Sequence, residues 1–335
     1  MNEVQRLSAT SRDLSRAAFQ NPWPGQPPPG FKDVLRWRFR DRLLARVAPN
    51  PARGWLARRT PSIAVPRADP GYRSATWVGH ATVLLQLGGL NILTDPVWGE
   101  RASPLRWIGP RRLTPPGVDF DALPPIDVVL LSHNHYDHLD APTVRRIAKQ
   151  CPGANWLCPL GLGELLTSLG VRSIEERNWW QTVDGAGYSA TCTPARHFSG
   201  RGFHDRGASL WCGWTIAADG VRVYFAGDTA LHPEFAAIGE RSGPFDLVLL
   251  PIGAYAPRWF MESVHMNPED AMAAYRAVTS HGGGRPPCLT LHWGTFRLTD
   301  EPVEEPPARF AQRWNEAAFP PTANWTLAIG ETKRL

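Results

Sequence analysis

Long apolar runs and paired cysteines are both missing from this sequence of 335 residues. The longest apolar segments, such as "IDVVLL" and "LVLLPIGAYA", fall far short of the roughly 18 to 20 residues that a membrane-spanning helix needs. The N-terminal segment "MNEVQRLSATSRDLSRAAFQ" contains no apolar signal-peptide core. The five cysteines are scattered and form no CxxC pair, so we expect free cysteines in the core and no disulfide framework. These absences predict a cytoplasmic protein.

Basic charge is concentrated near the N-terminus: residues 1–70 carry a net charge of +8 and residues 71–335 a net charge of −3. In "FKDVLRWRFRDRLLARV", apolar residues recur every four positions with arginines between them, which predicts a basic amphipathic helix. Such a helix packs its apolar stripe on the body or on a partner subunit, or else lies on the anionic inner face of a membrane. The apolar residues are Phe31, Leu35, Phe39, Leu43 and Val47, and the arginines are Arg36, Arg38, Arg40, Arg42 and Arg46.

The sequence pattern changes near residue 71. Before it, "NPWPGQPPPG" is too rich in proline for a helix or a central strand and predicts an extended arm. After it, short apolar strands alternate with turns and helices, beginning with two or three strands in "SATWVGHATVLLQLGGLNILTDPVW" and including a helix that starts after Asp140. We therefore predict an N-terminal arm over residues 1–70 and one α/β domain over residues 71–335.

Four potential metal ligands follow an apolar run in "LLSHNHYDHLD": His133, His135, Asp137 and His138. Histidines two positions apart in an extended segment project to the same side, while the following aspartate and histidine can turn toward a second point. Neutral imidazole and carboxylate are the ligands that a borderline metal such as zinc prefers. A single histidine in a core is more often structural, but four such residues within six positions favour a site for two metal ions.

Further ligands are expected where other strands end. His197 in "TPARHFSG", Asp228 in "FAGDT" and His292 in "LHWGTF" each follow a predicted strand. We expect His197 to complete the site of His133 and His135, His292 to complete the site of Asp137 and His138, and Asp228 to bridge both metal ions through its two oxygens.

This arrangement resembles the metallo-β-lactamase superfamily, whose fold is a four-layer αββα sandwich of the α/β class. Segments such as "TWVGHATVLLQL", "ILTDPVW", "FAGDTALHPEF" and "GPFDLVLLPIGAYAPRWFM" resemble more specifically the N-acyl-phosphatidylethanolamine-hydrolysing phospholipase D family, from "FQNPWP" to the C-terminus. The resemblance implies a bacterial member with the same seven ligands, two zinc ions per chain and a homodimer. Iron or manganese would accept the same ligands.

The resemblance also assigns roles outside the ligand set. It implies that His265 in "SVHMNPEDA" acts with Asp137 as a catalytic residue, contacting the substrate phosphate or helping the leaving group depart. Val264 stands where the animal phospholipases carry a glutamine, which puts head-group specificity in doubt. Asp95 in "LTDP" is expected to orient the ligand loop, and His80 in "GHAT" to support the ligands or the structure.

The expected reaction is attack of a metal-bridging hydroxide on the phosphorus of an N-acyl-phosphatidylethanolamine-like lipid, giving N-acylethanolamine and phosphatidate. Trp107, Trp259 and Phe260 are the expected substrate contacts. The alternative is a lactonase on acyl or sugar-phosphate lactones, which would use the same metals. A nuclease would require basic charge around the site, and residues 71–335 are net negative, so no nucleic acid is expected. A scaffold without activity would require a degraded site, and every ligand position is filled.

Overall fold

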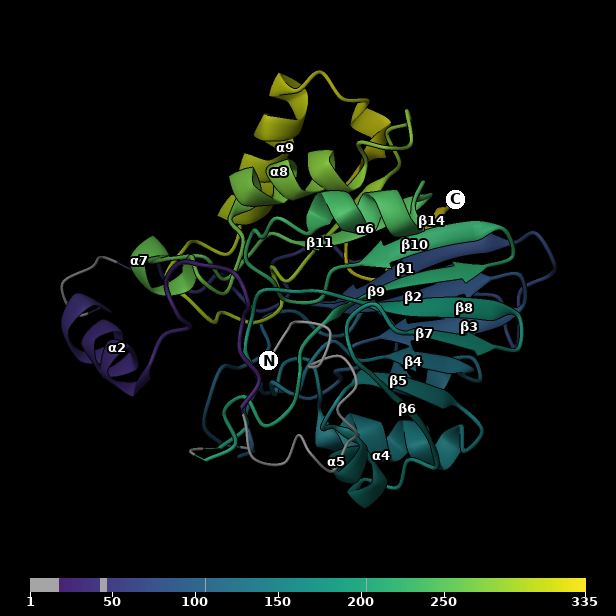
Figure 1. Ribbon diagram of the computed structural model, residues 1–335, viewed down its shortest axis with the longest axis horizontal. Coiled ribbons are helices and arrows are strands. Elements are labelled where there is room, and N and C mark those ends of the chain that lie inside the picture. The colour runs from purple at the N-terminus through teal and green to yellow at the C-terminus, as the bar shows by residue number, and fades with distance from the viewer. Residues whose placement is uncertain (1–17, 43–46, 106, 203) are drawn as a thin grey trace, which may run out of the picture.

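The computed structural model describes residues 18–42, 47–105, 107–202 and 204–335. In this part of the chain, two seven-stranded sheets lie face to face, with helices covering both outer faces (Figure 1). The predicted αββα sandwich is therefore confirmed.

The first sheet has the strand order β14-β1-β2-β3-β4-β5-β6. The pairs from β14 to β3 are antiparallel and those from β3 to β6 are parallel. A turn at Gly88 and Gly89 joins β2 to β3, and both glycines have positive φ, a conformation that favours glycine. The strands are β1 (Arg73–Gly79), β2 (Thr82–Leu87), β3 (Leu90–Thr94), β4 (Val128–Leu130), β5 (Asn155–Pro159), β6 (Ser173–Arg177) and β14 (Thr332–Arg334).

The second sheet has the order β13-β12-β11-β10-β9-β8-β7. Its strands β10 to β13 run parallel, and β8 runs in the same direction because it pairs antiparallel with β9, which pairs antiparallel with β10. Strands β8, β10 and β12 therefore present their carboxyl ends to one edge of the sandwich, and the residues that follow β4 of the first sheet cluster with residues that follow these strands. The strands are β7 (Thr182–Gly185), β8 (Tyr188–Thr193), β9 (Gly213–Ala218), β10 (Val221–Phe225), β11 (Leu247–Pro251), β12 (Cys288–Leu291) and β13 (Asn324–Trp325).

Helices α4 (Ala141–Gln150) and α5 (Gly163–Ser168) cover the outer face of the first sheet. On α4, Val144 and Ile147 are buried at the three-residue spacing of an amphipathic helix. Asp140 occupies the predicted N-cap position, but its carboxylate accepts from the backbone N–H of Gly99 instead of capping the helix.

The outer face of the second sheet is covered by α6 (Phe235–Ser242), α8 (Pro268–Val278) and α9 (Glu305–Glu316). Asn267 caps α8 by accepting from the N–H of Asp270, which fixes where this helix begins. Three shorter helices lie in connecting segments: η3 (Phe120–Ala122), α7 (Arg258–Met261) and η4 (Pro321–Ala323).

Between the sheets lies the larger hydrophobic core, which takes residues from both. Trp77 of β1 and Trp293, just after β12, bring their ring centroids within 5.0 Å, and both are buried. Packing across the sandwich therefore fixes the loops at the strand ends relative to each other, because the strands that carry them belong to one core.

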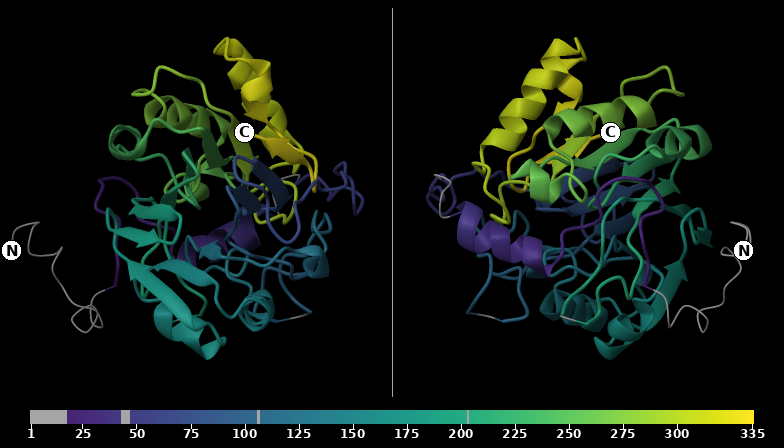
Figure 2. Two further views of the ribbon diagram at one scale, coloured as in Figure 1. Left: turned by 90° about the vertical axis from the view of Figure 1, so that its right-hand side faces the viewer. Right: turned by 60° about the vertical axis from the view of Figure 1, so that its left-hand side comes forward.

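The basic N-terminal segment forms α2 (Phe31–Arg36), continued by a π-helical turn, η2 (Trp37–Asp41). Figure 2 shows the segment before it, residues 18–30, running in an extended path along the body. A helix was predicted here, but Val47 is not helical. Leu43 and Arg46 lie outside the described residues. Residues 1–17, in which no signal-peptide core was expected, also lie outside them.

The apolar stripe of this helix does not pack on the body, so of the surfaces expected for it a partner subunit or a membrane remains. The side chains of Phe31 and Phe39 are 66% and 67% exposed, and Leu35 is also exposed. Instead Trp37 faces the body, where its ring stacks on Phe260 at 5.1 Å. No helix within the described residues is both long and apolar enough to cross a membrane.

Candidate metal centre

All seven predicted ligands lie at the edge where the carboxyl ends of β4, β8, β10 and β12 meet. Four of them occupy the loop after β4, and one follows each of the other three strands. Six of the seven are buried, and His135 is partly buried. Segments far apart in the sequence therefore deliver their polar side chains to one place.

The first group of donor atoms belongs to His133, His135 and His197. His133 Nε2 lies 2.8 Å from His135 Nδ1, which lies 3.2 Å from His197 Nε2. Nitrogen ligands at about 2.0–2.1 Å from a tetrahedral zinc ion are separated by roughly 3.3 Å. The spacing of these three nitrogens therefore fits a shared cation.

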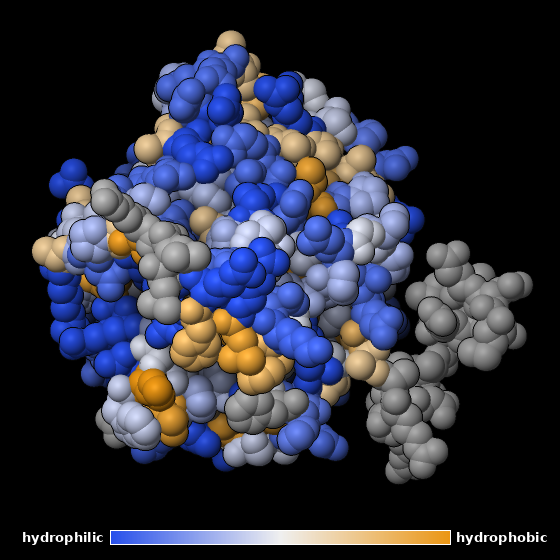
Figure 3. Space-filling view, turned by 90° about the vertical axis from the view of Figure 1, so that its left-hand side faces the viewer, coloured by the Kyte–Doolittle hydropathy of each residue, from blue (hydrophilic) through white to orange (hydrophobic). Residues whose placement is uncertain are grey.

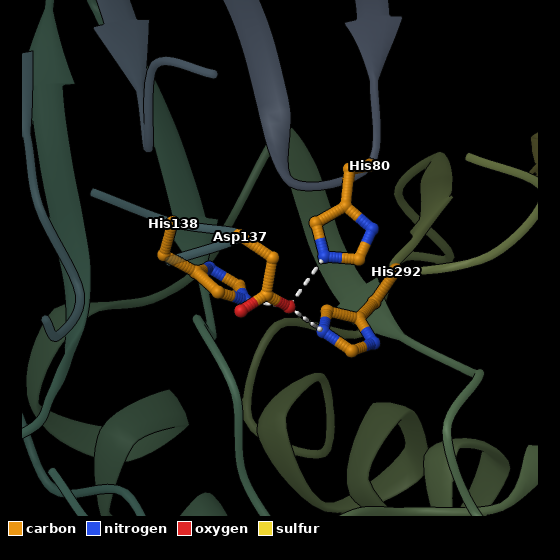
Figure 4. Close-up of side chains that lie close together, drawn as sticks. All are labelled: His80, Asp137, His138 and His292. Carbon is orange, nitrogen blue, oxygen red and sulfur yellow. Dashed lines mark hydrogen bonds and ion pairs between the residues drawn. The ribbon is translucent and has the colours of Figure 1, made fainter. Parts of the chain in front are cut away.

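The second group contains Asp137, His138, His292 and also His80, all shown in Figure 4. Asp137 Oδ2 lies 3.4 Å from Nε2 of both His138 and His292. It also lies 2.9 Å from His80 Nε2, and the ring of His80 stands 4.1 Å from that of His292. His80 thus contacts a predicted ligand directly.

Asp228 lies between the two groups. Its Oδ2 is 3.1 Å from His138 Nε2 and 3.0 Å from His292 Nε2 on one side. On the other side it is 3.9 Å from Nε2 of both His133 and His197. This central position is the one that a bridging carboxylate requires.

A hydrogen-bonded network behind the ligands fixes their orientation. Asp95 accepts from His138 Nδ1 at 2.6 Å, from Ser132 Oγ at 2.6 Å and from the Ser132 backbone N–H at 2.8 Å. Because Ser132 donates to Asp95, its oxygen is free to accept from His133 Nδ1 at 2.8 Å. His197 donates from Nδ1 to the carbonyl of Val264 at 2.8 Å. His133 and His197 therefore each keep an unprotonated Nε2 that points into the site.

Three residues of the site have left-handed backbone conformations that side chains other than glycine rarely adopt. The φ angles are 55° at His80, 28° at Asp95 and 62° at His292. Such conformations cost of the order of 1 kcal/mol or more each, and they persist where the surrounding structure enforces them. Here they turn the side chains back toward the cluster immediately after a strand.

Burial and charge divide the histidines into two kinds. Burial lowers the pKa of His80 and His135 to about 3 and that of His197 to about 4, so these rings are neutral at pH 7. Burial also opposes protonation of His292, but the carboxylates of Asp228 and Asp137 together outweigh it and raise the pKa of His292 to about 9. The half of the site that holds Asp137 and Asp228 therefore attracts positive charge.

The donor atoms fit a metal ion better than they fit one another. Among the described residues, Nε2 of His138, Nε2 of His292 and Oδ1 of Asp228 are buried without a hydrogen bond. Leaving a buried polar atom unpaired costs about 1–3 kcal/mol, and a cation would satisfy all three at once. The His/Asp cluster is therefore able to bind metal.

His265 lies beside this cluster, with Nδ1 3.9 Å from Asp228 Oδ2 and its ring 5.1 Å from that of His292. The predicted substrate contacts lie in different surroundings. Phe260 is buried in a small apolar cluster with Val264, and Trp259 packs against that cluster. Trp107 is 74% exposed.

The sequence did not reveal one contact to the site. Asn21, in the "NPWPG" arm, donates from Nδ2 to the backbone carbonyl of His197 at 2.9 Å and accepts from Trp211 Nε1 at 3.2 Å. Two residues on, Trp23 stacks on His232 at 4.7 Å and on Trp179 at 5.6 Å. An asparagine between a glutamine and a proline gave no signal of this role, because the contact is to a backbone atom.

An αββα sandwich with a histidine and aspartate cluster at its strand ends defines the class of metal-dependent hydrolases with the metallo-β-lactamase fold. Residues 90–293, which include all seven predicted ligands, match the beta-lactamase superfamily domain, and the chain belongs to this family. The protein is therefore a metallo-hydrolase of the beta-lactamase superfamily.

Its relatives include proteins with assigned activities. The chain is 42% identical over 243 residues to N-acyl-phosphatidylethanolamine-hydrolyzing phospholipase D 1 of Caenorhabditis elegans, covering 69% of this chain and 67% of that one. It is 45% identical over 308 residues to an uncharacterized protein of Mycobacterium tuberculosis, covering 91% and 80%. It is 32% identical over 235 residues to a UPF0173 metal-dependent hydrolase of Methanoculleus marisnigri, covering 69% and 85%.

Among solved structures, a metallo hydrolase from Ignicoccus hospitalis shares the fold with a TM-score of 0.57 and 24% identity, over 78% of this chain and 98% of that one. An isothiocyanate hydrolase from Delia radicum gut bacteria shares it with a TM-score of 0.60 and 20% identity, over 78% and 99%. At these identities the likeness concerns the fold alone.

Proposed function

We propose that this protein is a phosphodiesterase of the phospholipase D type that hydrolyses N-acyl-phosphatidylethanolamine-like lipids to N-acylethanolamine and phosphatidate. The supporting observation is the seven-residue cluster centred on Asp228, with His265 beside it. The Caenorhabditis elegans relative of 42% identity is named for this activity.

The seven residues would hold two zinc ions, with iron or manganese as the alternatives: His133, His135, Asp137, His138, His197, Asp228 and His292. Two such ions lower the pKa of water toward about 7 and neutralise the oxygens of a phosphodiester. The protein's own contribution is to hold these ligands rigid through Asp95, Ser132 and His80.

His265 is the group proposed to act on the leaving alcohol. Burial lowers the pKa of His265 well below its ordinary value, so the ring is neutral before substrate binds. An anionic phosphodiester beside it would favour its protonated form, and the proton would then pass to the departing alkoxide. Trp259 and Phe198 are partly buried and pack on the buried apolar cluster next to it, so these two side chains offer a surface for acyl chains.

Trp259, Phe260 and Trp107 remain the proposed substrate contacts, and of these Phe260 belongs to the apolar cluster beside His265. A homodimer and a boundary near residue 70 between the arm and the hydrolase domain are likewise proposals. Contacts with the body begin before that boundary, since Ala64 donates to the Gln86 side chain at 2.9 Å.

The test is a substrate panel with purified protein: N-acyl-phosphatidylethanolamine, phosphatidylethanolamine, phosphatidylcholine and an acyl lactone. We expect release of N-acylethanolamine from the first. His265→Ala should keep its metal while its rate falls roughly 10²–10⁴-fold, whereas Asp228→Asn should lose both metal and rate. His281→Ala, which changes an exposed histidine, is the control. Turnover of the lactone alone would replace the proposal with the lactonase alternative.

A further inference from the structure

A hollow of about 750 Å³ lies between the N-terminal helix and the loop of residues 101–113. Trp37 of η2 lines one side and Gly109 and Pro110 of the loop line the other. Seven of its lining residues are arginines, and one of them, Arg112, is buried and donates to the backbone carbonyls of residues 97 and 99. The other six are Arg38, Arg42, Arg53, Arg101, Arg111 and Arg297.

Positive charge in this hollow exceeds the negative charge paired with it. Asp300 pairs with Arg42 at 3.2 Å, and Glu100 serves both Arg53 at 2.8 Å and Arg111 at 3.5 Å.

The remaining arginines bind no carboxylate within the described part of the chain. Arg101 donates to the Gly109 carbonyl at 2.6 Å, and Arg297 donates to Asn50 and to backbone carbonyls. Burial and the nearby charge of Arg42 lower the pKa of Arg297, which indicates that the cations repel one another. An anion in the hollow would relieve this repulsion.

Apolar side chains stand exposed on the two elements that border the hollow. On the helix these are Phe31, Leu35 and Phe39, and on the loop they include Trp107 (74% exposed) and Ile108 (52% exposed). Figure 3 shows this face, where hydrophobic and strongly hydrophilic side chains lie side by side. Large exposed apolar side chains gathered around basic ones are typical of a surface that contacts an anionic lipid layer.

We propose that the hollow binds the phosphate of an anionic phospholipid while the apolar side chains on its two sides enter the lipid layer. A free phosphate ester would use the arginines but not the exposed aromatic rings, so the two features together favour a lipid. Arg297 and Leu298 line both this hollow and the smaller cavity that His292 lines, so a docked molecule would bring the metal centre close to the membrane. The proposal concerns binding and does not depend on which bond the enzyme cleaves.

The test is sedimentation of the full-length protein with phosphatidylcholine vesicles that contain or omit phosphatidate. Phosphatidate is a phosphate monoester, so it offers no phosphodiester bond to cleave. We expect binding only when it is present, weakened by salt. Arg38→Gln should reduce the affinity about fivefold, the effect of one basic residue near an anionic surface. Arg145→Gln on α4, an exposed arginine distant from α2 in Figure 1, should not change it.

Phe39→Ala tests the contribution of the apolar side chains, with Val65→Ala as its control, and His265→Ala tests whether the catalytic site takes part in vesicle binding. Phe39→Ala should weaken vesicle binding roughly tenfold, while Val65→Ala, which is 65% exposed near the start of β3, should have no effect. His265→Ala should bind vesicles as the wild type does. If His265→Ala loses binding, phosphatidate occupies the catalytic site and the proposal fails. If short-chain soluble phosphatidate binds as tightly as vesicles and Phe39→Ala changes nothing, the hollow is a site for soluble phosphate esters and the membrane proposal fails.

Discussion

Asp95 is a buried carboxylate that orients two of the predicted metal ligands, directly through His138 and indirectly through Ser132. It is fully buried and accepts three hydrogen bonds from Ser132 and His138. Asp95→Asn keeps the shape of the side chain but replaces the negatively charged carboxylate, which accepts from Ser132 Oγ and His138 Nδ1, with a neutral amide. We expect a 10- to 100-fold loss of metal affinity, measured by competition with a coloured chelator.

The control for Asp95→Asn is Asp119→Asn, because the Asp119 side chain is 82% exposed and, among the residues that the structure describes, pairs only with Arg58, at 3.3 Å. Both variants should give the wild-type circular dichroism spectrum. Equal metal affinity in the wild type and Asp95→Asn would show that the histidine orientations are held by packing alone.

His232 offers a test of burial without any metal ligand. Its ring lies between Trp23 and Phe235, and neither nitrogen makes a hydrogen bond within the described residues. Burial, with the nearby charge of Arg196, lowers the pKa of His232 to about 3. The folded protein thus keeps the ring neutral where the unfolded chain protonates it, so its contribution is fully present above about pH 6.5 and is lost as the pH falls toward 3.

We therefore expect His232→Phe to resist acid better than the wild type. Between about pH 6 and pH 4, the wild type should lose about 2.5 kcal/mol more of its unfolding free energy than the variant, as measured by urea denaturation. Parallel curves for the two proteins would mean that the buried ring is protonated as readily as an exposed one.

Sequence spacing predicted the candidate ligands, because their positions follow from the loop or the strand end on which they lie. The four candidate ligands in "HNHYDH" share one loop, and His197, Asp228 and His292 each follow a strand, so their convergence could be expected. Ser132 and Asn21 could not be found in this way. Their contacts depend on where a backbone carbonyl or a neighbouring ring nitrogen lies after folding, and no residue pattern encodes that.

The extended arm of residues 18–30 is more than a connection to the N-terminus. Phe19 donates its backbone N–H to the Gly207 carbonyl at 2.8 Å, and Asn21 holds the His197 backbone. These contacts press the arm against the loop that carries one predicted ligand. The arm is therefore positioned to stabilise the metal centre.

We expect Asn21→Ala to weaken metal binding several-fold, since its loss leaves the His197 carbonyl and the Trp211 indole N–H without this partner, at about 1 kcal/mol for each hydrogen bond. With Co²⁺ in place of the native metal, the visible absorption should also shift, because the ligand geometry changes. Gln20→Ala, at an exposed neighbour, should leave both unchanged. An unaltered spectrum in Asn21→Ala would show that the arm only covers the surface.

Regular elements were predicted where apolar pattern and burial agree. The three strands between residues 73 and 94 and the strands that precede the ligands were found from continuous apolar runs between turn residues, because central strands of this sandwich are buried on both faces. The basic helix was also found, yet the exposure of its apolar stripe was not decided by sequence. Periodicity shows that a helix has an apolar face but not what that face contacts.

Both sheets contribute predicted ligands to the centre. His133, His135, Asp137 and His138 come from the first sheet, while His197, Asp228 and His292 come from the second. Metal ions held by this cluster would link the two halves of the sandwich at the edge where the hydrophobic core ends. Metal binding should therefore stabilise the fold as a whole, since the unfolded chain has no such cluster.

Removing the metal with a chelator should lower the Tm of the wild type. At a free-metal concentration of about 100 times Kd, each site contributes about 2.7 kcal/mol, which corresponds to roughly 4 °C for a chain of this length. Adding zinc back should restore the Tm, whereas Asp228→Asn, which is missing the carboxylate between the two groups, should melt at the same temperature with or without chelator. If the chelator leaves the Tm of the wild type unchanged while metal analysis confirms that the ions have left, the cluster holds its shape without them, and the link between the two sheets comes from the hydrophobic core alone.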